Sequence, residues 1–394
     1  MGRRQRRSLP RRHVPTYSRR HCDVLGRQPP HGNDVTIACS SIRRSSSPSH
    51  QLVACQRLEQ VLSTHFGTPP VSGDRPRAGD TMKRMPPVAN PPRIAVLLAT
   101  HNGERYLDEQ LSTILSQEAV DITLLVSDDN STDGTRAKLK DAAARDPRIR
   151  VLTPGIFGEP APNFFRLLTE LDLDEIDYVG FADQDDRWAP RKLASHARLL
   201  IEHGADGVSS NVTAFRPDGS RTLIRKDYPQ RLADHLFETP GPGSSFLLTS
   251  RLARLVQHEL RDPASPARLV FAHDWLIYAM ARSAGLRWII DPTPTVDYRQ
   301  HDGNAVGANA GAAQALKRLR LSAAGWHRRQ VELTVDACLR VASAEEAPRL
   351  AWFREVLSRK TLTESLRLAR RASQLRRRPR DRFVLFGLLV TGLW

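Results

Sequence analysis

The sequence predicts an α/β protein built on a doubly wound, mostly parallel sheet. From about residue 93 to residue 182, short apolar segments that favour strands alternate with segments of helical spacing. The chain has 394 residues, 40% of them hydrophobic, which is enough for a large core. The order β-α-β-α-β-α-β implies parallel strands joined by right-handed helical crossovers.

The first strand is expected at Arg93–Ala99, an uninterrupted apolar run typical of a parallel strand covered on both faces. Further strands are expected at 122–127, 149–152 and 178–182, and helices at 106–117, from about 136, and at 162–171. Gly-x-Gly-x-x-Gly does not follow the first strand, so the fingerprint of a dinucleotide-binding fold is missing.

In the second half of the body, the sequence patterns that predict helices and strands are weaker. A helix is expected at 192–201, where Gly204 ends it, and a hairpin around the Pro217-Asp218-Gly219 turn. A loop then leads into the apolar residues 246–248. The remaining predicted elements are helices from about 250 and at 273–283, a strand at 287–290, and a largely helical region at 312–374.

Composition divides the chain into three parts: a basic N-terminal extension at 1–90, a body at 91–311, and a basic helical extension with an apolar tail at 312–394. Their formal charges are +11, −6 and +11, which together give the net charge of +16. The acidic balance of the body disfavours a groove for a nucleic-acid backbone. The first part has little hydrophobic periodicity and is predicted to be disordered.

The four cysteines, Cys22, Cys39, Cys55 and Cys338, show neither CxxC pairing nor zinc-ligand spacing. A body without cysteine suits a reducing cytosol, so a cytoplasmic protein is expected. No apolar run reaches the 18–20 residues of a membrane-spanning helix.

The turn after the strand at 178–182 carries three carboxylates within four residues, Asp183, Asp185 and Asp186. Carboxyl ends of strands form the ligand-binding edge of open α/β sheets. Like charges this close repel unless a cation or hydrogen-bond donors compensate, and Mg²⁺ or Mn²⁺ shared with substrate phosphates would do so. The alternative is a solvated acidic turn.

Other polar side chains are expected to converge on the same edge of the sheet. They follow the first strand (Thr100, Asn102, Glu104), the second strand (Asp128, Asp129) and the fourth strand (Asp183, Asp185), and are joined by His273, Asp274 and His301. Such an oxygen-rich pocket with imidazoles suits a metal-bound diphosphate and a general base.

These residues resemble the family 2 glycosyltransferases of the GT-A fold, and within them the rhamnosyltransferase-like branch. The resemblance covers roughly residues 92–310 and implies a Rossmann-like sheet. The motifs that carry it are Thr100-His101-Asn102-Gly103, Ser127 to Thr135, Asp183-Gln184-Asp185-Asp186 with Trp188, His273-Asp274-Trp275, and Tyr298-Arg299-Gln300-His301 with Asn304.

The resemblance also implies roles. Thr100 and Asp128 would contact the nucleotide base, with Glu104, Asp129 and nearby Asn102 supporting that pocket. Asp183 would face the ribose, Asp185 would bind the metal, and His301 would complete the metal shell. Asp274 would be the general base. Many relatives carry a Glu or Asp before the base, where this chain has His273.

Each role has a plainer alternative. Asp274 would also cap the helix that it opens, as Asp133 would cap the helix after the second strand. His301 would also suit a solvated loop. Trp275 suits either an acceptor platform or the core, and Gly243-Ser244 suits either the acceptor entrance or a plain turn.

The sequence therefore favours an inverting, metal-dependent glycosyltransferase. Its donor would be a nucleoside-diphosphate sugar, with dTDP-L-rhamnose favoured, and its acceptor a glycan or lipid-linked hydroxyl. Two alternatives stay open: a nucleotidyltransferase on a similar sheet, and a basic nucleic-acid-binding protein. A nucleotidyltransferase would be expected to have a Gly-rich basic signature after the first strand.

The tail at 383–394 is strongly apolar and follows the arginine-rich segment 376–382. It is too short to span a bilayer. Two interpretations are open: the tail attaches peripherally to the anionic cytoplasmic leaflet, or it packs on the body as a final core helix.

Deleting residues 1–81 is expected to leave a folded, active enzyme, because this segment has no periodic apolar pattern to add to the core. Thermal unfolding and transferase rate of the truncated chain check this. Loss of solubility or of activity would contradict it.

Overall fold

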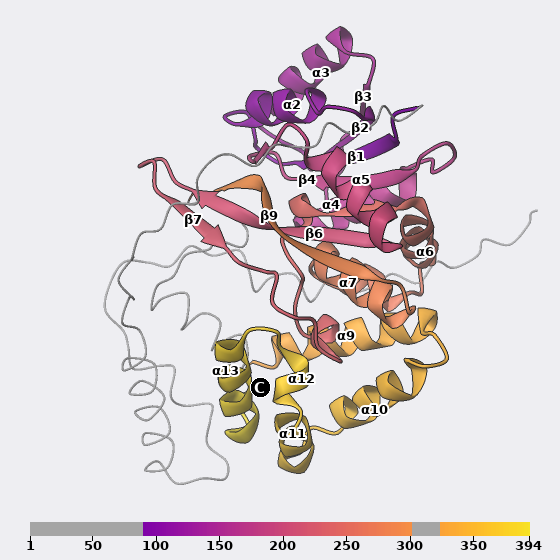
Figure 1. Ribbon diagram of the computed structural model, residues 1–394, viewed down its shortest axis with the longest axis vertical. Helices are drawn as coiled ribbons and strands as arrows, with labels where there is room; N and C mark the ends of the chain where they lie inside the picture. The colour runs from indigo at the N-terminus through magenta and orange to yellow at the C-terminus, as the bar shows by residue number, and fades with distance from the viewer. Residues whose placement is uncertain (1–89, 302–323) are drawn as a thin grey trace, which may run out of the picture. The chain divides into compact units, whose positions relative to one another are not determined.

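The computed structural model describes residues 90–301 and 324–394 (Figure 1). The predicted N-terminal extension, with Cys22, Cys39 and Cys55, lies outside the described residues except for its last residue. The predicted boundary at 311 also lies outside them. The described parts contain one cysteine, the buried Cys338, which is not in a disulfide.

The first half of the sheet is parallel and follows the order β3-β2-β1-β4. These strands are β3 (Ile149–Val151), β2 (Asp121–Asp128), β1 (Arg93–Thr100) and β4 (Tyr178–Ala182). In β1, Ile94, Val96 and Leu98 pack into one core cluster, whereas Ala95 and Leu97 pack into the other. Because successive side chains point to opposite faces, a strand that is apolar throughout serves two cores.

Helices cover both faces of this half. The core around Ile94 includes side chains of α2 (Leu107–Leu115), α3 (Thr135–Arg145) and α5 (Lys192–His203). The core around Ala95 includes those of α4 (Pro160–Glu170), α6 (Ser250–Arg261) and α7 (His273–Ser283). The predicted doubly wound α/β fold is therefore confirmed. Helix α5 ends at Gly204, whose φ of 55° is the left-handed conformation predicted for that position.

The second half of the sheet is mixed. Strand β8 (Leu247–Thr249) is antiparallel to both β4 and β6 (Gly207–Phe215). Strand β9 (Trp288–Arg299) is parallel to β6, and two short strands, β7 (Arg221–Ile224) and β5 (Arg187–Trp188), pair antiparallel with β6 and β9.

Two predictions differ here from the structure. Strand β9 continues nine residues beyond the predicted end at Ile290, because its pairing with β6 resumes after a register shift at Ser210/Val212. Pro292 and Pro294 interrupt the apolar pattern within it and conceal the strand in the sequence. The short strand β5, which contains Trp188, is absent from the predicted elements.

The C-terminal residues form the helical extension that the sequence predicts. Its helices are α9 (Trp326–Val341), α10 (Ala347–Ser358), α11 (Leu362–Ala369), α12 (Ala372–Leu375) and α13 (Pro379–Val390). They lie together beside α7 (Figure 1), and their side chains join the core that α7 belongs to. Over residues 90–301 and 324–394, no helix has the length and apolar character to cross a membrane.

Candidate active site

The carboxyl ends of β1, β2 and β4 meet at one edge of the sheet, because these strands are parallel neighbours. Thr100 pairs with Asp128 in register, and its hydroxyl donates to the Asp128 carboxylate at 2.8 Å. The backbone N–H and the hydroxyl of Ser131 donate to the same carboxylate at 2.9 and 2.5 Å. Asp128 is buried, and these donors fix its carboxylate.

The loop after β1 is bonded to the loop after β2. The side-chain oxygen of Asn102 accepts from the N–H of Thr132 at 2.8 Å, and the Glu104 carboxylate accepts from the N–H of Gly134 at 2.8 Å. A Cβ on Gly134 would lie 2.3 Å from the Glu104 carboxylate, so a larger residue there would displace this carboxylate from its hydrogen bond. The two loops therefore hold each other in place.

Asp129 connects the loop after β2 to the segment after β3. Its carboxylate accepts from the N–H groups of Phe157 and Gly158 at 2.6 and 2.8 Å. Asp133 accepts from the N–H of Thr135 at 3.0 Å, but the N-cap of α3 is Gly134, so Asp133 lies one residue before the capping position.

The acidic turn after β4 is held from two sides. The Gln184 amide exchanges two hydrogen bonds of 2.8 Å with the backbone of His101. From β9, the N–H of Arg299 donates to the Asp186 carboxylate at 3.1 Å, and its guanidinium donates to the carbonyl of Asp185 at 2.8 Å. These bonds fix the backbone of the turn that carries Asp183 and Asp185.

Asp185 and Asp274 both lie within electrostatic range of Asp183, although Asp274 is on α7. The pKa of Asp183 is raised to about 7, mainly by burial and also by the nearby charges of Asp185 and Asp274. Burial raises the pKa of Asp274 to about 6, while hydrogen bonds from Trp275 N–H and the Thr239 hydroxyl oppose that rise. The three carboxylates therefore belong to one site.

His301 lies against the acidic turn. Its Nε2 is 2.6 Å from a carboxylate oxygen of Asp185, and its ring lies 5.2 Å from that of Tyr106. The structure thus brings together the two residues expected to bind a metal. In the described parts of the chain, no three His, Cys, Asp or Glu side chains gather as a metal-binding group. A carboxylate and an imidazole nevertheless fit a divalent ion that takes its other ligands from phosphates and water.

Asp274 lies in the first turn of α7, and the N-cap of this helix is Ala272, without a side-chain capping bond. Asp274 accepts a hydrogen bond from the N–H of the next residue, Trp275, at 2.7 Å. It therefore does not occupy the capping position. Its negative charge at a helix N-terminus is nonetheless favourable.

His273 is a buried core residue. Its ring stacks on Phe164 with centroids 3.9 Å apart, and burial lowers its pKa to about 3, so the ring is neutral at physiological pH. A Cβ on Gly243 would lie 2.2 Å from His273 Nε2, which explains glycine at 243.

Two residues considered for the acceptor side are buried. Trp275 is 4% exposed, and its indole N–H donates to the carbonyl of His235 at 2.9 Å. Ser244 is 1% exposed and lies in a single 3₁₀ turn, Gly243–Ser245. Neither side chain is presented to an acceptor in this structure. Their burial favours a core tryptophan and a plain turn, and the acceptor roles stay predictions.

Sequence reasoning missed Lys192, the first residue of α5. Its ammonium group lies 3.8 Å from the centroid of the Trp188 ring, in the core below the acidic turn. Burial lowers its pKa to about 7, and the charge of Asp186 opposes this shift. A lysine at the start of a helix ordinarily faces water, so no feature of the sequence indicates that Lys192 is buried.

Sequence reasoning also missed the contact of the C-terminal extension with the loop that carries Thr239. Arg377 is 2% exposed, donates from its guanidinium to the carbonyl of Thr239 at 2.5 Å, and lies 3.4 Å from the Asp234 carboxylate. Its backbone N–H donates to Glu238 at 2.5 Å. In the sequence Arg377 is one of three consecutive arginines, which conceals its buried position.

Replacing Arg377 by methionine is expected to destabilise the fold by about 3 kcal/mol, because the buried Asp234 would lose a cationic partner. Thermal unfolding measures this, with Arg378→Met as the matched control, since Arg378 is exposed. Equal melting temperatures for the two variants would show that the ion pair contributes nothing.

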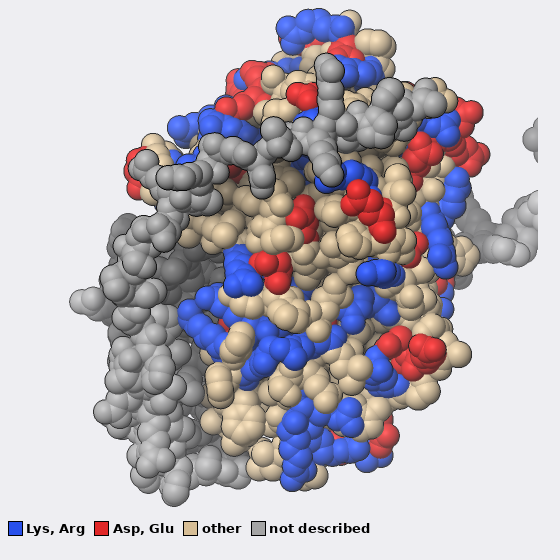
Figure 2. Space-filling view, viewed as in Figure 1, with Lys and Arg blue, Asp and Glu red and all other residues tan. Residues whose placement is uncertain are grey.

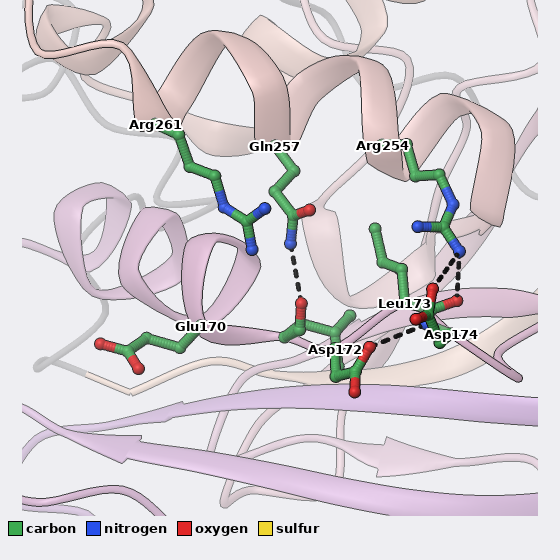
Figure 3. A pocket seen from close by; sticks show the side chains of 8 residues that line it. Glu170, Asp172, Leu173, Asp174, Arg254, Gln257 and Arg261 are labelled. Carbon is green, nitrogen blue, oxygen red and sulfur yellow. Dashed lines mark hydrogen bonds and ion pairs between the residues drawn. The ribbon is translucent and has the colours of Figure 1, made fainter.

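Figure 3 shows a pocket elsewhere, between the segment after α4 and helix α6. Its donors are bonded to backbone carbonyls: Gln257 donates to Leu168 and Leu171 at 2.7 and 2.8 Å, and Arg254 donates to Leu173 at 2.7 Å. These bonds connect α6 to the chain before β4. The pocket has none of the convergent carboxylates of the strand-end site.

Comparison with known proteins agrees with this geometry. The profile of glycosyl transferase family 2 matches residues 95–270. The chain is 36% identical over 242 residues to the dTDP-rhamnosyl transferase RfbG of Shigella flexneri, covering 61% of this chain and 84% of RfbG. It is 28% identical over 237 residues to the O-antigen biosynthesis protein RfbC of Myxococcus xanthus, covering 56% of this chain and 17% of RfbC.

Among solved structures, the S. aureus TarS 1-349 complex with UDP is similar, with 16% identity and a TM-score of 0.47, covering 76% of this chain and 86% of that one. The match to RfbG and the family profile define the class of protein: it is a glycosyltransferase. The chain belongs to glycosyl transferase family 2, as its motifs predict.

Proposed function

We propose that the protein transfers a sugar, with inversion, from a nucleoside-diphosphate sugar to a hydroxyl of a glycan or lipid-linked acceptor in cell-surface polysaccharide synthesis. The observation that carries the proposal is that Asp185, in the same strand-end turn, and Asp274, in the first turn of α7, both lie within electrostatic range of Asp183. The similarity to a dTDP-rhamnosyl transferase favours dTDP-L-rhamnose as the donor. Transfer would take place on the cytoplasmic side, where the inner leaflet presents lipid-linked acceptors.

The donor pocket would be formed by the two interlocked loops after β1 and β2. Thr100 and Asp128 would contact the base, and Asn102, Glu104 and Asp129 would keep the loops in position. Asp183 would face the ribose. Because these loops are already bonded to each other, little ordering would accompany binding of the nucleotide.

Asp185 and His301 would hold Mg²⁺ or Mn²⁺ together with the two phosphates. The ion would supply positive charge to the departing nucleoside diphosphate. The protein's own contribution is to fix the position of these ligands, through Gln184 on one side of the turn and Arg299 on the other.

Asp274 would act as the general base. With a pKa of about 6 it is ionised at neutral pH, and it is more basic than an ordinary aspartate. It would accept the proton of the acceptor hydroxyl while the hydroxyl oxygen bonds to the anomeric carbon, opposite the bond that breaks to the diphosphate. The Thr239 hydroxyl and the Trp275 N–H would hold its carboxylate in position.

A panel of nucleotide sugars tests this proposal, with released nucleoside diphosphate as the measured product in the presence of Mg²⁺ or Mn²⁺. The largest release is expected with dTDP-L-rhamnose. Preference for another sugar would overturn the donor assignment. Release from none of the donors, with cell-envelope glycolipids supplied as acceptors, would overturn the proposed function. The nucleotidyltransferase and nucleic-acid alternatives have no support from the family match.

A further inference from the structure

The last helices expose an unusual share of the apolar surface. Twelve large hydrophobic side chains are exposed among the described residues. Six of them lie within residues 362–390, which make up about a tenth of the residues described: Leu362, Leu366, Phe383, Val384, Phe386 and Val390. Phe383 is 77% exposed, the second-highest value in this set.

Helix α13 is fixed on the body by its opposite face. Leu385, Leu389 and Trp394 are buried and belong to the large core cluster. The core-packing interpretation of the tail is therefore correct for this face. Since residues three and four apart share a helix face, Phe383 and Val384 lie together with Arg380 on the exposed side. Helix α11, with Leu362 and Leu366, packs against α13.

Basic side chains accompany this apolar face, which we call the α11–α13 face. Arg370, Arg378 and Arg380 are exposed at the ends of the two helices. Arg377 and Arg382 turn inward and bond to backbone carbonyls, so fewer arginines reach the surface than the sequence suggests. Lys and Arg gather over the C-terminal half of the molecule in Figure 2, where few acidic side chains are visible.

We propose that the α11–α13 face docks on an anionic lipid surface. Aromatic and aliphatic side chains would enter the headgroup boundary while the neighbouring arginines contact lipid phosphates. Helix α13 has 12 residues and would lie on the membrane rather than span it. If the partner were an acidic protein, this face would be expected to present charged and polar side chains. Instead, Phe383 and Phe386 are exposed here. The lipid surface would also present the sugar acceptor, an inference that rests on the proposed function.

Sedimentation of the full-length protein with vesicles tests the proposal. One set of vesicles contains equal parts of phosphatidylglycerol and phosphatidylcholine, and a second contains phosphatidylcholine alone. We expect binding to the first set that weakens as salt is raised. The double variant Phe383→Ser/Phe386→Ser should bind at least about tenfold more weakly, because two inserted side chains are lost. Arg378→Gln/Arg380→Gln should weaken binding and reduce its salt dependence.

Ile201→Ser is the matched control, because Ile201 is 72% exposed on α5, outside the α11–α13 face, and its variant should bind as the wild type does. Melting temperatures should stay unchanged in all variants, since every altered side chain is exposed. Absence of wild-type sedimentation with anionic vesicles, or undiminished sedimentation of the Phe383/Phe386 variant, would overturn the proposal. Binding of dTDP, followed by thermal shift, should not change in any variant. If the wild-type protein did not bind dTDP, this would count against the proposed function but not against the docking of the α11–α13 face on lipid.

Discussion

Replacing Asp185 by alanine should abolish sugar transfer while leaving the fold intact. Asp185 is expected to provide the carboxylate ligand of the metal, and its carboxylate lies 2.6 Å from Nε2 of His301. A metal at a leaving diphosphate contributes several kcal/mol to transition-state stabilisation, so a rate loss of about a thousandfold is expected. Nucleoside-diphosphate release at saturating Mn²⁺ measures this.

Asp174→Ala is a suitable control, because Asp174 is an exposed carboxylate that pairs with Arg254 far from the strand-end site. Its rate should equal that of the wild type. If Asp185→Ala retained the wild-type rate, and if that rate were insensitive to EDTA, Asp185 would not be a metal ligand.

The parallel half of the sheet could be predicted from the sequence because each strand is a continuous apolar run ended by polar residues. Strand β4 was expected at 178–182 and begins and ends at those residues. The mixed half was harder. Strand β9 was predicted only as far as Ile290, because two prolines follow, and β8 has three residues, which are too few to show a period.

The residues of the candidate site likewise fall into two groups: those whose position could be predicted from the sequence and those whose position could not. Strand ends are adjacent in any parallel sheet, so the sequence could predict that Asp128 and Asp183 converge. It could not predict that Arg377 reaches the loop of Thr239, or that Lys192 is buried below the acidic turn. Each of these side chains is positioned by tertiary packing, which the hydrophobic periodicity of the sequence does not predict.

Replacing Asp274 by asparagine should leave donor binding nearly normal and lower kcat by about 10²–10⁴-fold, since the variant keeps the size of the side chain but removes its basicity. Donor binding is measured with dTDP by thermal shift, and kcat by release of the nucleoside diphosphate. Asparagine has nearly the same size as Asp274, and it keeps an oxygen that can accept the hydrogen bond from the Trp275 N–H.

The pH profile gives an independent test of the same residue. Burial raises the pKa of Asp274 to about 6, so the base is protonated and inactive at lower pH. The rate of the wild type should therefore rise between about pH 5 and 7 and then level off. Asp274→Asn should lose this rise, because asparagine does not titrate. If the variant stayed within a few-fold of the wild-type rate and kept the rise, the proton would be taken by another group at the same edge of the sheet.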